Sequence, residues 1–214
     1  MKKSILNFLI VVFSPFIINA QVDNKSKAIL DEVSQKMQAY ESIKIDFTYS
    51  IENKNENIKD SKTGSLWMKK DKYKLEVTGQ TIICDGKTVW THIKEAEEVQ
   101  ITTPPNDDEA LTPNKLLTAY NKNYKSKFIK EDKQGGKEVQ IIDLTPNKGG
   151  KTFYKTRLII DKTSKQIISS TLYDRNGGTY TYSVNKFLPN QAIEDALFTF
   201  NTKDFPGIEI NDMR

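Results

Sequence analysis

The chain is short of the residues on which most catalytic and metal sites depend. Its 214 residues include one cysteine, Cys84, and one histidine, His92. A single cysteine can form neither an internal disulfide nor a cysteine-based metal site. One histidine is too few for a multi-histidine metal site, and a nucleophile–histidine–carboxylate triad would depend on that residue alone. We therefore expect a buried thiol at Cys84, an ordinary strand residue at His92, and no catalytic residue, metal or cofactor.

Phosphate-cradling glycine motifs and an excess of one charge are also lacking. The glycine pairs, such as Gly135-Gly136, stand in polar segments that predict hairpin turns. Lysine and arginine total 32 against 28 acidic residues, which is a mixed surface and not a nucleic-acid footprint. Acidic residues such as Asp46 and Glu52 alternate with apolar ones, which places them on solvated faces. The sequence therefore predicts no enzymatic activity and no nucleic-acid partner.

Long hydrophobic runs are absent after the first twenty residues. Lys2 and Lys3 precede an apolar stretch, Ile5–Phe13, and Ala20 ends a segment typical of a cleaved signal peptide. No later segment approaches the twenty apolar residues of a spanning helix. Residues 1–20 are thus predicted to be a signal peptide cleaved near Ala20. Residues 21–214 would form one exported domain outside the cytoplasm.

Hydrophobic periodicity changes sharply near residue 42. Between residues 23 and 40, apolar residues recur at helical spacing and predict an amphipathic helix. Residues 43–51 then alternate strictly between apolar and polar, which predicts a long strand with one wet face. The polar run 53–62 predicts a hairpin tip. A second short helix is predicted to start at Thr112-Pro113, because threonine is a good N-cap and proline suits the first helical position.

Ten more short strands are predicted along the rest of the chain. Glycine-rich and Asp-Gly dipeptides punctuate them, as in antiparallel hairpins. The predicted fold is mainly β, with about eleven antiparallel strands that curl into a barrel or a strongly bent sheet. The further strands are 63–69, 72–78, 81–84, 87–93, 98–102, 125–131, 138–145, 153–161, 166–174 and 179–187.

Consecutive strands supply many apolar side chains to one predicted face. Each of these residues could fill an ordinary core, but a wide curved sheet leaves space for a ligand that side chains do not fill. Two amphipathic helices are little material to cover such a sheet. The pattern therefore favours an apolar concavity with a helical cover. The residues are Phe47, Tyr49, Leu66, Met68, Tyr73, Leu75, Ile82, Trp90 and Ile101.

Three segments, in this order, resemble the LolA family of periplasmic lipoprotein carriers. Residues 64–70 (GSLWMKK) are similar to the family's G-x-L-W-V-K-R-P run. Residues 85–90 (DGKTVW) are similar to its S-D-G-K-T-L-W hairpin. The tail, with 198–200 (FTF) and 206–212 (PGIEIND), resembles its F-T-F and P-x-G-V-x-V-D-D segments.

The resemblance implies a fold, a cargo and partners. Family members have an unclosed eleven-stranded barrel, with a lid of short α-helices over an apolar cavity. They take triacylated lipoproteins from an inner-membrane ABC transporter and shuttle them to the outer membrane. We expect the same role here, in a monomer, while the outer-membrane acceptor stays unidentified. The resemblance places the acyl-chain cavity at Phe47, Tyr49, Leu66, Met68, Tyr73, Leu75, Trp90, Leu116 and Leu117.

One family position differs in this chain. The family's arginine after L-W-V-K, which hydrogen-bonds the lid shut in the empty state, aligns with Lys70, and Asp71 replaces the following proline. Lysine is a flexible point charge without the planar donor fork of arginine. Lys70 is therefore the expected lid contact, with a lock that is weaker or placed elsewhere.

Three other functions fit parts of the pattern. A sensor of the RseB type has the same half-barrel and binds lipids or misfolded lipoproteins, but it carries an additional domain. A membrane-anchored acceptor of the LolB type needs a lipidated cysteine after the signal, where this chain has Gln21. An unrelated β-protein without a ligand is the third alternative.

Overall fold

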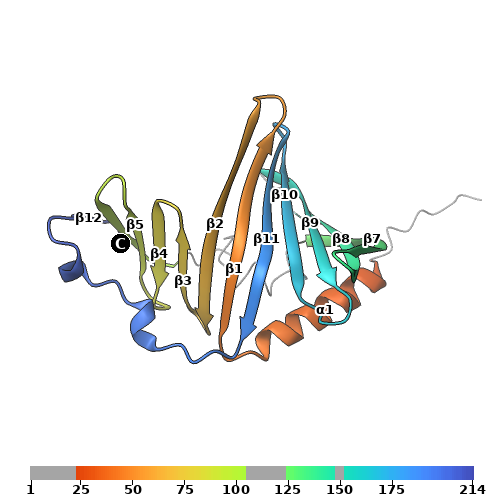
Figure 1. Cartoon of the computed structure of the whole chain (residues 1–214), viewed down its shortest axis with the longest axis horizontal. Helices are drawn as coiled ribbons and strands as arrows, with labels where there is room; N and C mark the ends of the chain where they lie inside the picture. The colour runs from red at the N-terminus through yellow and green to blue at the C-terminus, as the bar shows by residue number, and fades with distance from the viewer. Residues whose placement is uncertain (1–22, 105–123, 148–151) are drawn as a thin grey trace, which may run out of the picture.

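The computed structural model describes residues 23–104, 124–147 and 152–214, which form one helix and one large sheet (Figure 1). The elements are α1 (Asn24–Gln38), β1 (Ile43–Asn53), β2 (Ile58–Lys69), β3 (Lys72–Val77), β4 (Gln80–Cys84), β5 (Val89–Ile93), β6 (Glu98–Thr102), β7 (Tyr124–Gln134), β8 (Lys137–Pro146), β9 (Phe153–Asp161), β10 (Ile167–Asp174), β11 (Gly178–Pro189), the 3-10 turns η1 (Asp195–Phe198) and η2 (Thr202–Asp204), and β12 (Glu209–Asp212). No helix within these ranges is long and apolar enough to span a membrane.

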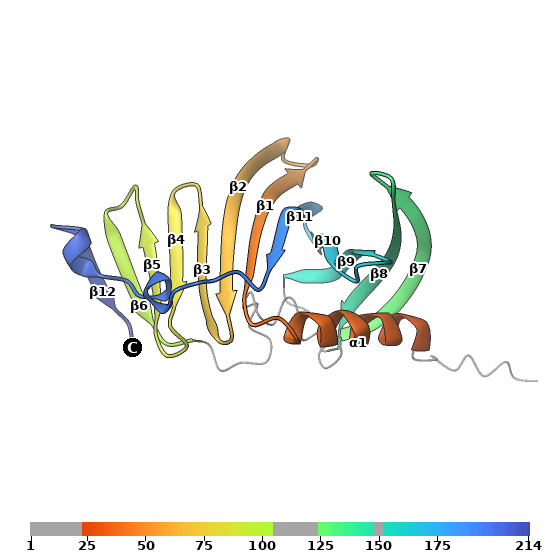
Figure 2. The ribbon, with the colours of Figure 1, turned by 60° about the horizontal axis from the view of Figure 1, so that its bottom comes forward.

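The twelve strands lie in the order β12-β6-β5-β4-β3-β2-β1-β11-β10-β9-β8-β7. Neighbours pair antiparallel, except that β12 runs parallel to β6. β1 is central because the late strand β11 returns to pair with it. The outer strands β12 and β7 stand at opposite ends of the curved sheet (Figure 2). The predicted unclosed, mainly β fold is therefore confirmed.

Two predictions about the strands need correction. The polar run 53–62 is mostly strand, because β1 continues to Asn53 and β2 already starts at Ile58. These strand ends need no apolar face, since the two backbones satisfy each other's hydrogen bonds. The tail adds a twelfth strand, β12, which the alternation within 209–212 was too short to reveal. The signal segment and the helix predicted from Thr112 lie outside the described residues.

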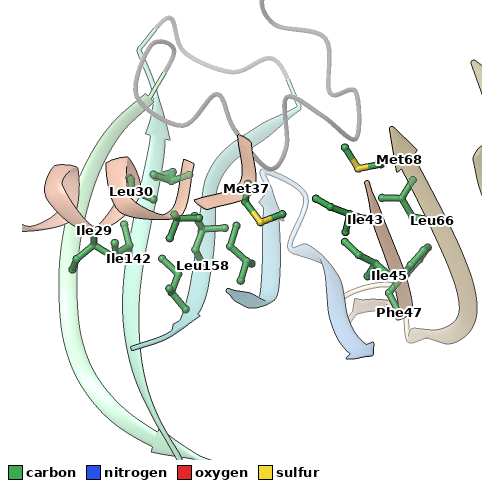
Figure 3. Packing of buried hydrophobic residues seen from close by; sticks show 14 residues of the cluster. Ile29, Leu30, Met37, Ile43, Ile45, Phe47, Leu66, Met68, Ile142 and Leu158 are labelled. Atoms are coloured by element: carbon green, nitrogen blue, oxygen red, sulfur yellow. The ribbon is translucent and has the colours of Figure 1, made fainter. Parts of the chain in front are cut away.

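The cross-strand register divides the side chains between two faces. We call the side against which α1 packs the α1 face, and the opposite side, against which the C-terminal segment packs, the tail face. α1 is capped by Asp23, whose Oδ1 accepts from the backbone N–H groups of Lys25 and Ser26. Its apolar stripe then lies on β8–β10 (Figure 3). The buried cluster on the α1 face is Ile29, Leu30, Val33, Met37, Ile43, Ile45, Phe47, Leu66, Met68, Ile142, Leu144, Leu158, Ile160 and Ile167.

The tail face has its own smaller apolar cluster. Ile83, Val99 and Phe200 are buried there, with Trp90 and Ile208 packed against them. Phe200 and Ile208 belong to the segment that follows β11, so the end of the chain covers strands from its first half. Burying such side chains stabilises the fold by about 1.5–3 kcal/mol each. The C-terminal segment is thus part of the fold and not an appendage.

Candidate functional site

The candidate site is the part of the α1 face formed by β1, β2 and β3. Register aligns Ile45 with Leu66, and Leu66 with Leu75. In the same way Met68 lies opposite Tyr73. Six of the predicted cavity residues therefore share this face. Phe47, Leu66 and Met68 are buried, whereas Tyr49, Tyr73 and Leu75 are half-buried.

Trp90 is separated from this group. It pairs with Ile83 and packs in the tail-face cluster, whereas Ile82 pairs with Thr91 on the α1 face. Because Ile82 and Ile83 are adjacent and both apolar, the sequence of β4 does not indicate which of them faces which side of the sheet. The tail supplies an apolar cover that makes a second buried face possible, and Ile101 shares that face with Trp90. The other two predicted residues, Leu116 and Leu117, lie outside the described residues.

The segment 64–70 serves both faces of the sheet. Its Leu66 and Met68 point to the α1 face. The intervening Trp67 lies on the tail face, where the ammonium groups of Lys44 and Lys74 stand 5.2 and 5.8 Å from its ring centroid. Alternate side chains of this segment thus contribute apolar residues to the α1 face and an aromatic ring covered by two ammonium groups to the tail face.

The segment 85–90 is a structural turn. Asp85 Oδ1 accepts from the backbone N–H groups of Lys87 and Thr88, both at 2.8 Å. Gly86 has a φ of 96°, which favours glycine. The preceding Cys84 is buried as predicted, and burial raises the pKa of its thiol. These contacts fix the β4–β5 hairpin.

His92 is a packing residue on the tail face. Its ring centroid lies 4.6 Å from that of Phe205 and 5.8 Å from that of Phe200. Burial lowers the pKa of the imidazole, so it is neutral at pH 7. Within the described ranges, no three histidine, cysteine or acidic side chains come together as a metal site would require. His92 therefore helps to attach the tail.

Lys70 occupies the exposed turn between β2 and β3, with a φ of 54°. Its neighbours Lys69 and Lys72 both bind Asp195 of η1, at 2.9 and 2.8 Å. These hydrogen-bonded ammonium groups lower the pKa of the Asp195 carboxyl to about 2. The turn is thus anchored to the C-terminal segment on either side of Lys70. The predicted lid segment lies outside the described residues, so the lid contact of Lys70 stays a prediction.

The second half of the chain contributes to the same face, which sequence reasoning missed. Val184 and Phe187 of β11 pack against the α1-face cluster, and the ring of Tyr182 lies tilted against the rings of Phe47 and Tyr49. The alternation of Tyr180, Tyr182 and Val184 was visible in the sequence. It could not be assigned to a face, because the register of β11 against β1 shifts between Asp46 and Phe47.

The α1 face combines apolar side chains with a few hydroxyl groups. Burial raises the pKa of both Tyr49 and Tyr73 to about 12, so their hydroxyl groups are neutral hydrogen-bond donors. Neutral donors set among aliphatic and aromatic side chains suit an uncharged apolar ligand with few polar groups.

Comparison with known proteins agrees with this geometry. The family model for the outer membrane lipoprotein carrier protein LolA matches residues 38–201. An uncharacterised conserved protein from Thermus thermophilus is 11% identical, with a TM-score of 0.56, over 88% of this chain and 99% of that one. The Mycobacterium tuberculosis lipoprotein LppX is 10% identical, with a TM-score of 0.51, over 80% and 98%.

A more distant likeness is to MucB in the Pseudomonas aeruginosa MucA/MucB complex. It is 11% identical, with a TM-score of 0.42, over 84% of this chain and 62% of that one. Curated protein sequences give no match to the chain. The family match covers well over half of the sequence. The chain belongs to the LolA family of outer membrane lipoprotein carrier proteins.

Proposed function

We propose that this protein is a periplasmic carrier that binds the acyl chains of lipoproteins on the α1 face and shuttles them from the inner to the outer membrane. The observation that carries the proposal is the apolar surface of β1–β3, which extends beyond α1 through Phe47, Leu66 and Met68 (Figure 3). Half-buried Tyr49, Tyr73 and Leu75 belong to the same surface. If this surface were an ordinary packed core, we would expect these side chains to be fully buried. The described residues offer no competing metal site.

The energetics of acyl chains explain why such a surface is needed. At ~0.8 kcal/mol per CH₂, a sixteen-carbon chain gains roughly 12 kcal/mol on leaving water. Three chains on one lipoprotein therefore cannot cross an aqueous compartment without a protein surface to cover them. Release requires only modest net affinity, which follows if covering segments bury similar apolar area in the empty protein. Leu116 and Leu117 are proposed to belong to such a cover.

The partners are proposed by the same reasoning. The cargo would be triacylated lipoproteins, delivered by an inner-membrane lipoprotein-releasing ABC transporter. Lys70 is proposed to contact the lid, and its exposed turn leaves the ammonium group accessible. If this contact stabilises the lid over the empty surface, Lys70→Ala should slow loss of bound acyl ligand, while Lys70→Arg should accelerate it. Identical release rates in both variants would mean that the lid is held elsewhere.

The test is to express the full chain with its leader, isolate it from the periplasm and extract bound lipid for mass spectrometry. A carrier should hold acylated lipoprotein or its lipids, and should release newly made lipoproteins from spheroplasts into solution. A sensor of the RseB type would bind lipid or misfolded lipoprotein without releasing it from the membrane. Absence of bound lipid and of release activity would contradict the proposal.

A further inference from the structure

On the α1 face, one row of aligned residues across neighbouring strands carries polar side chains next to the apolar cluster. Along β1, Ile43, Ile45 and Phe47 are buried, and the next inward residue is Tyr49. Along β2 the aligned residues change from apolar Met68 and Leu66 to the exposed Lys62.

The same change occurs on β11. Phe187 and Val184 pack in the apolar cluster, and Tyr182 follows with 38% of its surface exposed, against 7% for Phe47. Register places Lys62, Tyr49 and Tyr182 side by side across three neighbouring strands. We call this row of polar groups, which borders the buried cluster, the rim; apolar Ile51 and Leu172 follow it on the same face.

The two tyrosines of this rim form a pair. Their ring centroids are 4.8 Å apart, and the two residues are register partners on β1 and β11. Each hydroxyl group carries one proton that it can donate to a third group. These donors lie where the exposed ring of Tyr182 meets the apolar cluster. Ser170, aligned with Tyr182 on β10, adds another hydroxyl to the row.

We propose that Tyr49 and Tyr182, beside Lys62, bind the carbonyl groups that join acyl chains to the polar end of the ligand. This inference rests on the proposed function and makes it specific for esters and amides. An acyl chain lying along Phe47 and Ile45 toward Ile43 would place its carbonyl oxygen at the rim. A carbonyl oxygen accepts a hydrogen bond from a neutral phenol. A hydrocarbon chain, or an ether lipid at the same position along the chain, has a CH₂ group there and no acceptor.

Two matched lipids test this inference. Dipalmitoylglycerol has two ester carbonyls, and dihexadecylglycerol has ether links and chains of the same length. Each would displace a fluorescent fatty-acyl probe from the full mature chain. The wild-type protein should prefer the ester by about three- to tenfold, the effect of one hydrogen bond. In Tyr49→Phe/Tyr182→Phe the preference should disappear, because the variant loses affinity for the ester relative to the ether.

Tyr173→Phe is the matched control, because Tyr173 lies on the tail side of β10 under the ammonium group of Lys155. It should keep the wild-type preference, and thermal melts should show that all variants are folded, since phenylalanine retains the stacked rings. An ester preference that survives in the double variant would overturn this inference alone. A wild-type protein that binds neither lipid would overturn the proposed function and this inference with it.

Discussion

The ring of Phe47 lies across the backbone of Gly64, its partner on β2. A methyl group at Gly64 would come within 2.6 Å of Phe47 Cζ and of the Glu76 carbonyl oxygen. Glycine in a strand often marks such a close approach. The first residue of the segment 64–70 is therefore glycine because the aromatic floor of the α1 face needs the space.

Gly64→Ala should destabilise the protein by about 1–3 kcal/mol, as overpacking of a core usually does. Phe47→Leu in the same chain should recover part of the loss, because it removes the clashing end of the ring. Urea unfolding of the single and double variants measures both effects. Thr63→Ala, at the exposed neighbouring position, is the control. A Gly64→Ala variant as stable as this control would refute the packing argument.

Asp23 caps α1 and also attaches the helix to β7. Its Oδ1 accepts from the N–H groups of Lys25 and Ser26, and its Oδ2 accepts from the backbone N–H of Phe128 on β7. Asp23→Ala should cost roughly 1–2 kcal/mol, the upper range for a lost N-cap. Asn24→Ala, at an exposed first-turn position, should cost far less. Hydrogen exchange should quicken at both the α1 N-terminus and Phe128, and exchange confined to the helix would disprove the second attachment.

Asp195 holds the tail beside Lys70 in a pH-dependent manner. Folding lowers its pKa from 3.8 to about 2, so the ion pairs with Lys69 and Lys72 favour the attached tail above pH 4. Their contribution is lost as the pH falls toward 2. At neutral pH, Asp195→Asn should increase proteolysis near η1 relative to the wild type. Asp204→Asn is the control, and equal cleavage of the three proteins would show that the ion pairs do not hold the tail.

Leu75→Gln separates a binding surface from an ordinary core. Leu75 is half-buried, so the variant should lose only about 1–2 kcal/mol of stability. Affinity for a fluorescent fatty-acyl probe should fall much more, because water would then occupy the path of the chain. Ile210→Gln, at an exposed apolar position on β12, should change neither quantity. Severe destabilisation of Leu75→Gln with unchanged probe binding would identify Leu75 as plain core.

Local periodicity predicted most of this fold, and long-range packing decided the rest. The alternation of Ile43, Ile45 and Phe47 predicted their shared face, and the helical stripe through Val33 predicted the packing of α1. Trp90 was wrongly predicted to be a cavity residue. Phe200 covers the tail face of β5, so neither face of this strand is left open to water. That cover comes from more than a hundred residues later in the sequence, beyond the reach of local patterns. The rim residue Tyr182 escaped prediction for the same reason, since its place depends on the β1–β11 register.

The most direct test of acyl binding on the α1 face is fluorescence quenching by a brominated stearoyl ligand. The chain has two tryptophans, Trp67 and Trp90, and both lie on the tail face. Bromine quenches only on close approach, so the ligand should quench wild-type fluorescence weakly. Tyr73→Trp, in a chain with phenylalanine at positions 67 and 90, places its indole on the α1 face and should be quenched strongly. Quenching of the wild type that equals or exceeds that of Tyr73→Trp would contradict acyl binding at this face.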